Sequence, residues 1–157
     1  MRVEIRVAGA ADGARLQAIY GPIVADTAQS FETEPPTVGE MAQRVTNTLA
    51  RLPWLVCEVD GVVAGYAYAS AYRARRAYQW SAEVSAYVDK AYRRRRIGTA
   101  LYGALFDVLV MQGYYTALAG ITLPNAASVR LHETVGFVPV GVYHGVGYKH
   151  GAWRDVG

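Results

Sequence analysis

The stretch 87-YVDKAYRRRRIGTALY-102 is the part of the sequence that predicts most about the fold. It runs from an apolar pair into four consecutive arginines and one glycine, and then into the apolar spacing of an amphipathic helix. A strand, loop and helix start in this order present unpaired backbone N–H groups at the positive end of the helix dipole. Such a turn can bind an anion. The same pattern also fits a solvated basic turn or a patch that contacts nucleic acid.

Composition narrows these alternatives. The 157 residues favour one domain over residues 1–157, and 52% hydrophobic with 18% charged residues is typical of a globular protein. The formal net charge is +3, and the run 93-RRRR-96 makes the basicity local. A domain built to bind nucleic acid more often spreads Lys and Arg over a whole face. We therefore expect no nucleic-acid partner.

The single cysteine, Cys57, excludes a disulfide within the chain and indicates a reducing cytoplasm. It lies in the apolar run 54-WLVCEV-59, where a small buried strand residue is the expected role. The N-terminal segment alternates like a strand and has no apolar core of signal-peptide length. The most apolar window, 115–123, has the length of a buried strand. We expect a cytoplasmic protein with no membrane partner.

Periodicity and turn signals predict the order β-α-α-β-β-β-α-β-α-β-β, an α/β three-layer arrangement on a mixed sheet. Asp60-Gly61 indicates a two-residue hairpin turn, and Thr37 with Glu40 indicates a capping box at a helix start. The expected helices cover about 12–28, a segment after Thr37, 98–112 and 125–134. The expected strands cover 2–7, 54–59, 62–71, 81–88, 115–123, 137–143 and 147–153.

A second motif, 124-PNAASVRLHETVGFVPVG-141, places an asparagine at a helix start, a histidine about two turns later and Gly-Phe at the helix end. Together with the R-x-x-x-x-G loop, it resembles the GCN5-related N-acetyltransferase (GNAT) superfamily, close to the phosphinothricin and methionine sulfoximine acetyltransferases. The segments 31-FETEP-35, 78-YQWSAEVSAYV-88 and 148-YKHGAWRDVG-157 support the resemblance, which covers nearly the whole chain. It implies a three-layer α/β/α acyl-CoA N-acyltransferase fold with a mixed, mostly antiparallel central sheet.

The resemblance implies acetyl-CoA as co-substrate and no metal ion. The implied cofactor-binding residues form a strand edge, the arginine loop with the following helix start, a helix position beside the cofactor, and a position near its pantetheine or thiol end: Ala86, Tyr87 and Val88; Arg93, Arg94, Arg95, Arg96, Ile97, Gly98 and Thr99; Tyr102; and Asn125. One departure concerns Arg96, which occupies the first glycine position of the superfamily loop. Its Cβ and any requirement for positive φ would affect the turn.

For catalysis, the amine that attacks a thioester must lose a proton, so a carboxylate or imidazole is required nearby. The resemblance implies Glu83 as the general base and His132 as a proton relay. Without it, a solvent-facing strand glutamate and a structural helix histidine are equally ordinary readings. For the acceptor, it implies Phe31, Arg73, Arg75 and Tyr78, although an arginine-rich loop between strands is usually solvated surface.

The function that the resemblance implies is acetylation of the α-amino group of phosphinothricin, methionine sulfoximine or methionine sulfone, which serves detoxification. Two alternatives remain open: acetylation of another amine, such as a peptide N-terminus, polyamine or aminoglycoside, and a non-catalytic basic binding module. The resemblance also implies a homodimer. Relatives continue past residue 157 into a further strand, so we expect an exposed sheet edge or one that a partner subunit completes.

Overall fold

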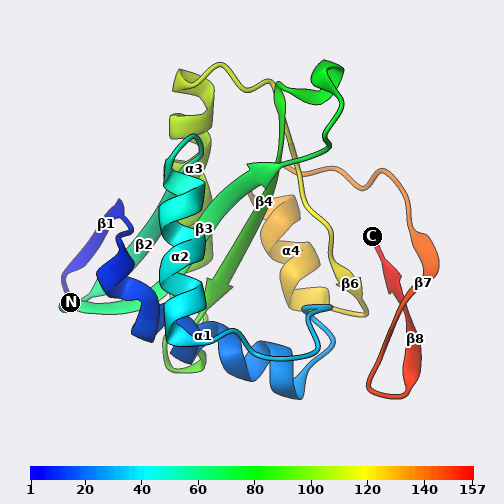
Figure 1. Cartoon of the computed structure of the whole chain (residues 1–157), viewed down its shortest axis with the longest axis horizontal. Helices are drawn as coiled ribbons and strands as arrows, with labels where there is room; N and C mark the ends of the chain where they lie inside the picture. The colour runs from blue at the N-terminus through cyan, green and yellow to red at the C-terminus, as the bar shows by residue number, and fades with distance from the viewer.

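The computed structural model describes residues 1–157 and has a five-stranded first sheet (Figure 1). Its strands lie side by side in the order β1-β2-β3-β4-β5. All neighbours are antiparallel except β4 and β5, which are parallel. The strands are β1 (Val3–Val7), β2 (Trp54–Val59), β3 (Val62–Ala71), β4 (Ser81–Val88) and β5 (Thr116–Leu118). The prediction of a mixed, mostly antiparallel sheet is confirmed.

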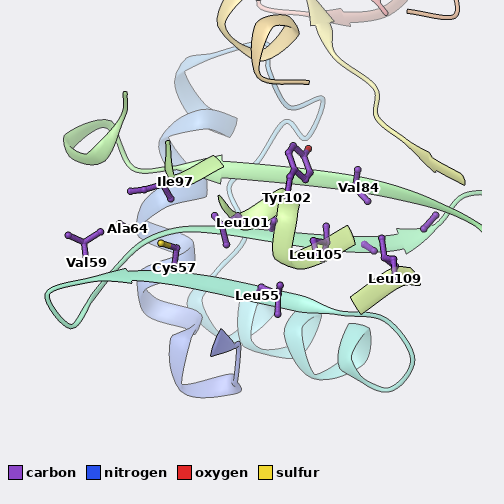
Figure 2. Close-up of a cluster of buried hydrophobic side chains, with 13 residues drawn as sticks. Leu55, Cys57, Val59, Ala64, Val84, Ile97, Leu101, Tyr102, Leu105 and Leu109 are labelled. Carbon is purple, nitrogen blue, oxygen red and sulfur yellow. The ribbon is translucent and has the colours of Figure 1, made fainter. Parts of the chain in front are cut away.

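Helices cover both faces of this sheet. Helix α3 (Ile97–Met111) packs on one face, where Leu101 and Leu105 are fully buried against the strands (Figure 2). Helices α1 (Gly13–Asp26) and α2 (Val38–Leu49) pack on the other face. Because residues of β2 alternate between the two cores, the whole run 54–59 is apolar except for one glutamate. The three-layer α/β/α prediction is therefore confirmed.

A second, smaller sheet lies beside the first. It has the order β6-β8-β7 and comprises β6 (Thr122–Leu123), β7 (Tyr143–Lys149) and β8 (Ala152–Val156). Helix α4 (Ala126–Thr134) follows β6 and packs against α3 through Leu131 and Gly98. Strand β7 is an edge strand and is unpaired on its outer side, whereas the last strand of the chain, β8, lies in the middle of the sheet.

The local turn and cap signals are confirmed. Asp60 and Gly61 both have positive φ, at 50° and 81°, in the turn between β2 and β3. The Thr37 hydroxyl accepts from the Glu40 amide at 3.1 Å and the Glu40 carboxylate accepts from the Thr37 amide at 3.2 Å. Cys57 is fully buried, and burial raises the pKa of its thiol. No helix combines the length and apolar character that crossing a membrane requires.

The strand predictions for the last third of the chain need correction. The segment 115–123 is not one buried strand: β5 and β6 belong to different sheets, and Tyr115 is 94% exposed. The segment 137–143 lies mostly outside any strand, because Pro139 offers no N–H to a ladder and no neighbouring strand pairs with it. The segment 147–153 is a hairpin, with His150 and Gly151 at positive φ in its turn.

Candidate active site

A large cavity forms where the first sheet opens. Strand β4 pairs with β5 only from Ser81 to Glu83, and the next residues of the chain after β5 turn away to the second sheet. The resulting cavity has a volume of about 1070 Å³. It lies between the second half of β4, the N-terminal ends of α3 and α4, and residues 120–122. A ligand of considerable length can enter there between strands that would otherwise pair.

The exposed edge of β4 offers unpaired backbone groups to this cavity. The Asp89 amide donates to the Ala64 carbonyl at 2.9 Å, and pairing with β3 is regular throughout β4. Because backbone groups alternate in direction along a strand, those of Ala86 and Val88, which lie beyond the residues paired with β5, point away from β3. Only one of them has a side-chain partner: Arg93 Nε donates to the Val88 carbonyl at 3.4 Å. An extended ligand could pair with this edge as an additional strand.

The arginine loop ends in an uncapped helix. Arg94 and Arg96 adopt left-handed backbone conformations, with φ of 63° and 58°. Arg96 is the N-cap of α3, and no side chain caps the helix. The first amide to reach the cap is that of Ala100, which donates to the Arg96 carbonyl at 3.0 Å. The amides of residues 97–99 therefore have no helical partner, and all three residues line the cavity.

The cavity wall is positively charged. Arg93, Arg94, Arg96 and Arg130 contribute to it, and no aspartate or glutamate does. Arg95 is not part of the wall, because its guanidinium lies over the Tyr92 ring, 5.4 Å from the centroid. Arginines combined with unpaired amides at a helix N-terminus favour phosphate groups.

Gly98 lies where helix α3 meets helix α4. A Cβ at this position would lie 2.9 Å from Cδ2 of Leu131 on α4. Gly98 therefore lets α3 and α4 pack closely, and this packing brings α4 to the cavity.

A hydrogen-bonded pair of rings lies at the inner wall. His132 Nδ1 is 2.7 Å from the Ser128 carbonyl oxygen, which can only accept, so Nδ1 carries the hydrogen. In the neutral ring, Nε2 is then an acceptor, and the Tyr102 hydroxyl donates to it at 2.9 Å. Both residues are buried and line the cavity, and burial raises the pKa of Tyr102. The Tyr102 hydroxyl therefore stays protonated at neutral pH.

Comparison with known proteins assigns the family. A model of the acetyltransferase (GNAT) domain matches residues 5–156. The phosphinothricin N-acetyltransferase of Streptomyces viridochromogenes is 44% identical over 99% of this chain and 85% of its own length. An L-methionine sulfoximine/L-methionine sulfone acetyltransferase of Salmonella typhimurium is 35% identical over 97% of this chain and 90% of its own length. The chain belongs to the GNAT acetyltransferase family.

A solved structure agrees with this assignment. The crystal structure of a GNAT superfamily phosphinothricin acetyltransferase from Sinorhizobium meliloti, in complex with acetyl-CoA, matches with a TM-score of 0.93 and 35% identity. The match covers 99% of this chain and 85% of that one. GNAT acetyltransferases use acetyl-CoA, and the shape and charge of the cavity described above suit a long, phosphorylated molecule.

The structure gathers most of the cofactor-binding residues that the sequence of this GNAT protein predicts. Eleven of the twelve line one cavity, together with His132; Arg95 is the exception. The side-chain oxygen of Asn125 accepts from the Ser128 amide at 3.2 Å, which caps α4 and leaves its NH₂ group free. Glu83 is exposed at the rim: its Oε1 lies 3.9 Å from where a Cβ on Gly120 would be, and Gly120 is a wall residue.

The four predicted acceptor residues lie outside the cavity wall. The Arg73 guanidinium stacks on the rings of Tyr72 and Tyr78, at 4.9 and 5.5 Å from their centroids. Arg75 is exposed at the start of the short helix 76–78. The Phe31 ring packs against the backbone of Gly147 on β7. Within one chain, these residues do not form a single pocket.

Sequence reasoning missed several wall residues. Arg130 and Thr134 line the cavity with Ala126, and their spacing of four residues places them on one face of α4. That spacing could have predicted the additional positive charge. Ile23 and Gln29 also line the cavity, but they lie in and after α1, far away in sequence, and no local pattern indicates their role.

The left-handed turn at Arg96 leads to a stability prediction. A non-glycine residue in this conformation costs about 1 kcal/mol relative to glycine. We expect Arg96→Gly to raise the free energy of unfolding by about that amount, and to weaken acetyl-CoA binding because one wall arginine is lost. Chemical denaturation and isothermal titration calorimetry measure the two effects.

The matched control is Arg95→Gly, in the same loop but without positive φ and outside the wall. It should not stabilise the protein and should leave acetyl-CoA affinity unchanged. Equal effects of the two substitutions on stability would contradict the assigned strain.

Proposed function

We propose that residues 1–157 act as one N-acetyltransferase domain that transfers the acetyl group of acetyl-CoA to the α-amino group of a small amino-acid analogue. The proposed acceptors are phosphinothricin, methionine sulfoximine and methionine sulfone, and acetylation would detoxify them. The observation that carries the proposal is the 44% identity, over 99% of the chain, to a phosphinothricin N-acetyltransferase.

The residues present fit acetyl-CoA. The four wall arginines and the uncapped amides of residues 97–99 would hold its phosphates. The backbone of Ala86 and the amide of Val88, which face the cavity, would hold its pantetheine arm, and Asn125 has a free NH₂ group for the thiol end. When bound, acetyl-CoA supplies an acetyl group on an activated thioester.

The acid–base work is assigned to groups of this chain. Glu83, exposed at the cavity rim, takes the proton of the incoming ammonium directly or through water, which makes the amine nucleophilic. His132 has a fixed Nδ1–H and a basic Nε2, and the Tyr102 hydroxyl connects it to the cavity. The amine loses a second proton as the amide bond forms; we assign this pair to accept that proton on Nε2 through the Tyr102 hydroxyl and to return it by the same path to the departing thiolate.

We further propose a homodimer that works in the cytoplasm. The C-terminal hairpin carries apolar side chains that nothing in one chain covers, among them Tyr143, Tyr148 and Trp153, which are 64%, 61% and 70% exposed. They lie on or beside the unpaired edge strand β7, which a second copy of the chain would cover. Sedimentation measurements on the purified chain test this proposal.

The proposed substrate class is tested by measuring CoA release. With saturating acetyl-CoA, we expect kcat/KM for phosphinothricin, methionine sulfoximine or methionine sulfone to exceed that for spermidine, an aminoglycoside and a short peptide by at least about 100-fold, since a site that pairs a buried polar group rejects compounds lacking it by such factors. Acetyl-CoA binding without CoA release for any of the three analogues would rule out this substrate class.

A second prediction concerns the general base. We expect Glu83→Gln to lower kcat by at least about 100-fold, because a positioned base contributes a factor of this order. Affinity for acetyl-CoA should stay within twofold, since the side chain is at the rim. Glu133→Gln, which changes an exposed glutamate on α4, is the control and should leave both values unchanged. A Glu83→Gln enzyme with normal kcat would show that the base lies elsewhere.

The Tyr102–His132 hydrogen bond yields a third prediction. If both rings transfer one proton in series, Tyr102→Phe and His132→Ala should each lower kcat, and the double variant should be no slower than the worse single one. Steady-state or stopped-flow kinetics on the two single variants and the double variant measure this double-mutant cycle, and circular dichroism confirms that each variant is folded. Reductions in kcat that multiply would indicate two independent roles.

A further inference from the structure

Lys149 is a buried charge that the proposed chemistry does not use. It is the last residue of β7 and is 6% exposed. Its Nζ donates to two backbone carbonyls, those of Val24 and Ser30, each at 2.7 Å, and it forms no ion pair. Burial lowers the pKa of Lys149. Lysines are rarely buried without a paired carboxylate. A buried lysine that is held only by two backbone carbonyls is therefore unusual.

The first carbonyl belongs to the end of α1. Val24 lies in the last turn of that helix, where carbonyl groups have no partner within the helix. An ammonium at this place completes one of these groups and also interacts favourably with the negative end of the helix dipole. The second carbonyl, of Ser30, lies six residues further along the chain. One side chain from the C-terminal hairpin thus fixes both ends of the segment 24–30.

This segment supplies part of the cavity wall. Ile23 and Gln29 line the cavity, and each immediately precedes a residue whose carbonyl Lys149 holds. Because a carbonyl is rigidly connected to its own residue and its neighbours, holding Val24 and Ser30 limits where Ile23 and Gln29 can lie. Lys149 itself does not line the cavity, so it acts through these neighbours.

Other contacts complete the connection. The Ser30 hydroxyl lies 2.7 Å from the Tyr20 hydroxyl, and Glu32 forms a two-pronged ion pair with Arg44 on α2. Between Ser30 and Glu32, the Phe31 ring lies so close to β7 that a Cβ on Gly147 would clash with it. The C-terminal hairpin of β7 and β8 therefore contacts the segment after α1 at two neighbouring places, through Lys149 at Ser30 and through Gly147 at Phe31.

The segment that Lys149 holds lines a different side of the cavity from the arginine loop, where the phosphates are expected to bind. The arginine loop and the N-terminus of α3 line the cavity from β4, whereas residues 23–30 approach from α1 towards α4 and β6 (Figure 1). We propose that Lys149 is a positioning residue that fixes the segment 23–32 as one wall of the amine-acceptor side. Its kinetic consequence rests on the proposed acetyltransferase function, whereas its structural consequence does not.

The kinetic test uses Lys149→Met, which keeps the length and apolar stem but removes the charge. We expect KM for the amine acceptor to rise at least tenfold, and KM for acetyl-CoA to stay within twofold. Lys149→Arg keeps a cation that can donate to both carbonyls, and should restore most of the amine affinity. A general loss of folding would instead lower the active fraction and leave both KM values unchanged, so that outcome overturns the proposal.

Hydrogen exchange gives a readout that needs no substrate. In Lys149→Met, the amides of residues 27–32 should exchange at least tenfold faster than in the wild type, while those of 97–99 should not change. Unchanged exchange in 27–32 would overturn the proposal even if activity fell. If acetylation is absent from the wild type but this exchange pattern is present, the proposed function fails and the positioning role stands.

Amine labelling of the unaltered enzyme offers an independent arm that does not depend on a variant folding. The chain has two lysines, Lys90 and Lys149, and Lys90 is exposed. With an acetylating reagent and peptide mass spectrometry, Lys149 should react at least tenfold more slowly than Lys90. Equal labelling rates would show that the two carbonyl contacts are not maintained in solution. Lys90→Met is the matched control in the kinetic and exchange measurements and should behave as the wild type.

Discussion

The structure depends on how short the pairing between β4 and β5 is. Three residue pairs join these parallel strands, and the chain then passes to a different sheet. Backbone groups of β4 that would otherwise bond to a neighbouring strand face a cavity, and unpaired backbone groups inside a protein need a partner. The same opening makes room for α4, and the missing side chain of Gly98 lets this helix approach α3. A ligand-sized space is thus a consequence of one interrupted ladder.

Sequence predicted the parts of the fold that short-range signals determine. The Asp60-Gly61 turn and the Thr37–Glu40 capping box need only residues at most three positions apart, and both appear as expected. The split between β5 and β6 depends on which strand lies beside each half of 115–123, a long-range property. The same holds for 137–143, whose alternating valines resemble a strand although none is available to pair with it. The turn at His150-Gly151 has positive φ at both positions, like that at Asp60-Gly61, but histidine is not one of the residues that mark such a turn in a sequence.

The candidate site shows the same difference between features set by neighbouring residues and features set by long-range packing. The strand edge, loop and helix start of residues 86–99 come together because they are consecutive, so one motif predicts nine of these wall residues. Arg73, Arg75 and Tyr78 come from a loop whose position relative to the cavity depends on tertiary packing, or on a second subunit, and they lie outside the wall of one chain. Gln29 lines the wall beside Ser30, whose carbonyl oxygen accepts a hydrogen bond from a lysine 119 residues later in the chain. No sequence pattern short of the whole fold contains that information.

Arg96 illustrates how site and scaffold make opposite demands on one position. The turn requires a left-handed residue at the N-cap of α3, for which glycine is the least costly choice. The cavity instead gains from a guanidinium at this place, because a fixed positive charge beside the unpaired amides of α3 attracts phosphate more strongly than the amides alone. Strain of this kind persists only where surrounding structure determines the conformation. Here the buried side chains of Ile97 and Leu101 anchor the helix immediately after the turn, so packing of α3 against the sheet holds the arginine in its strained conformation at the mouth of the cavity.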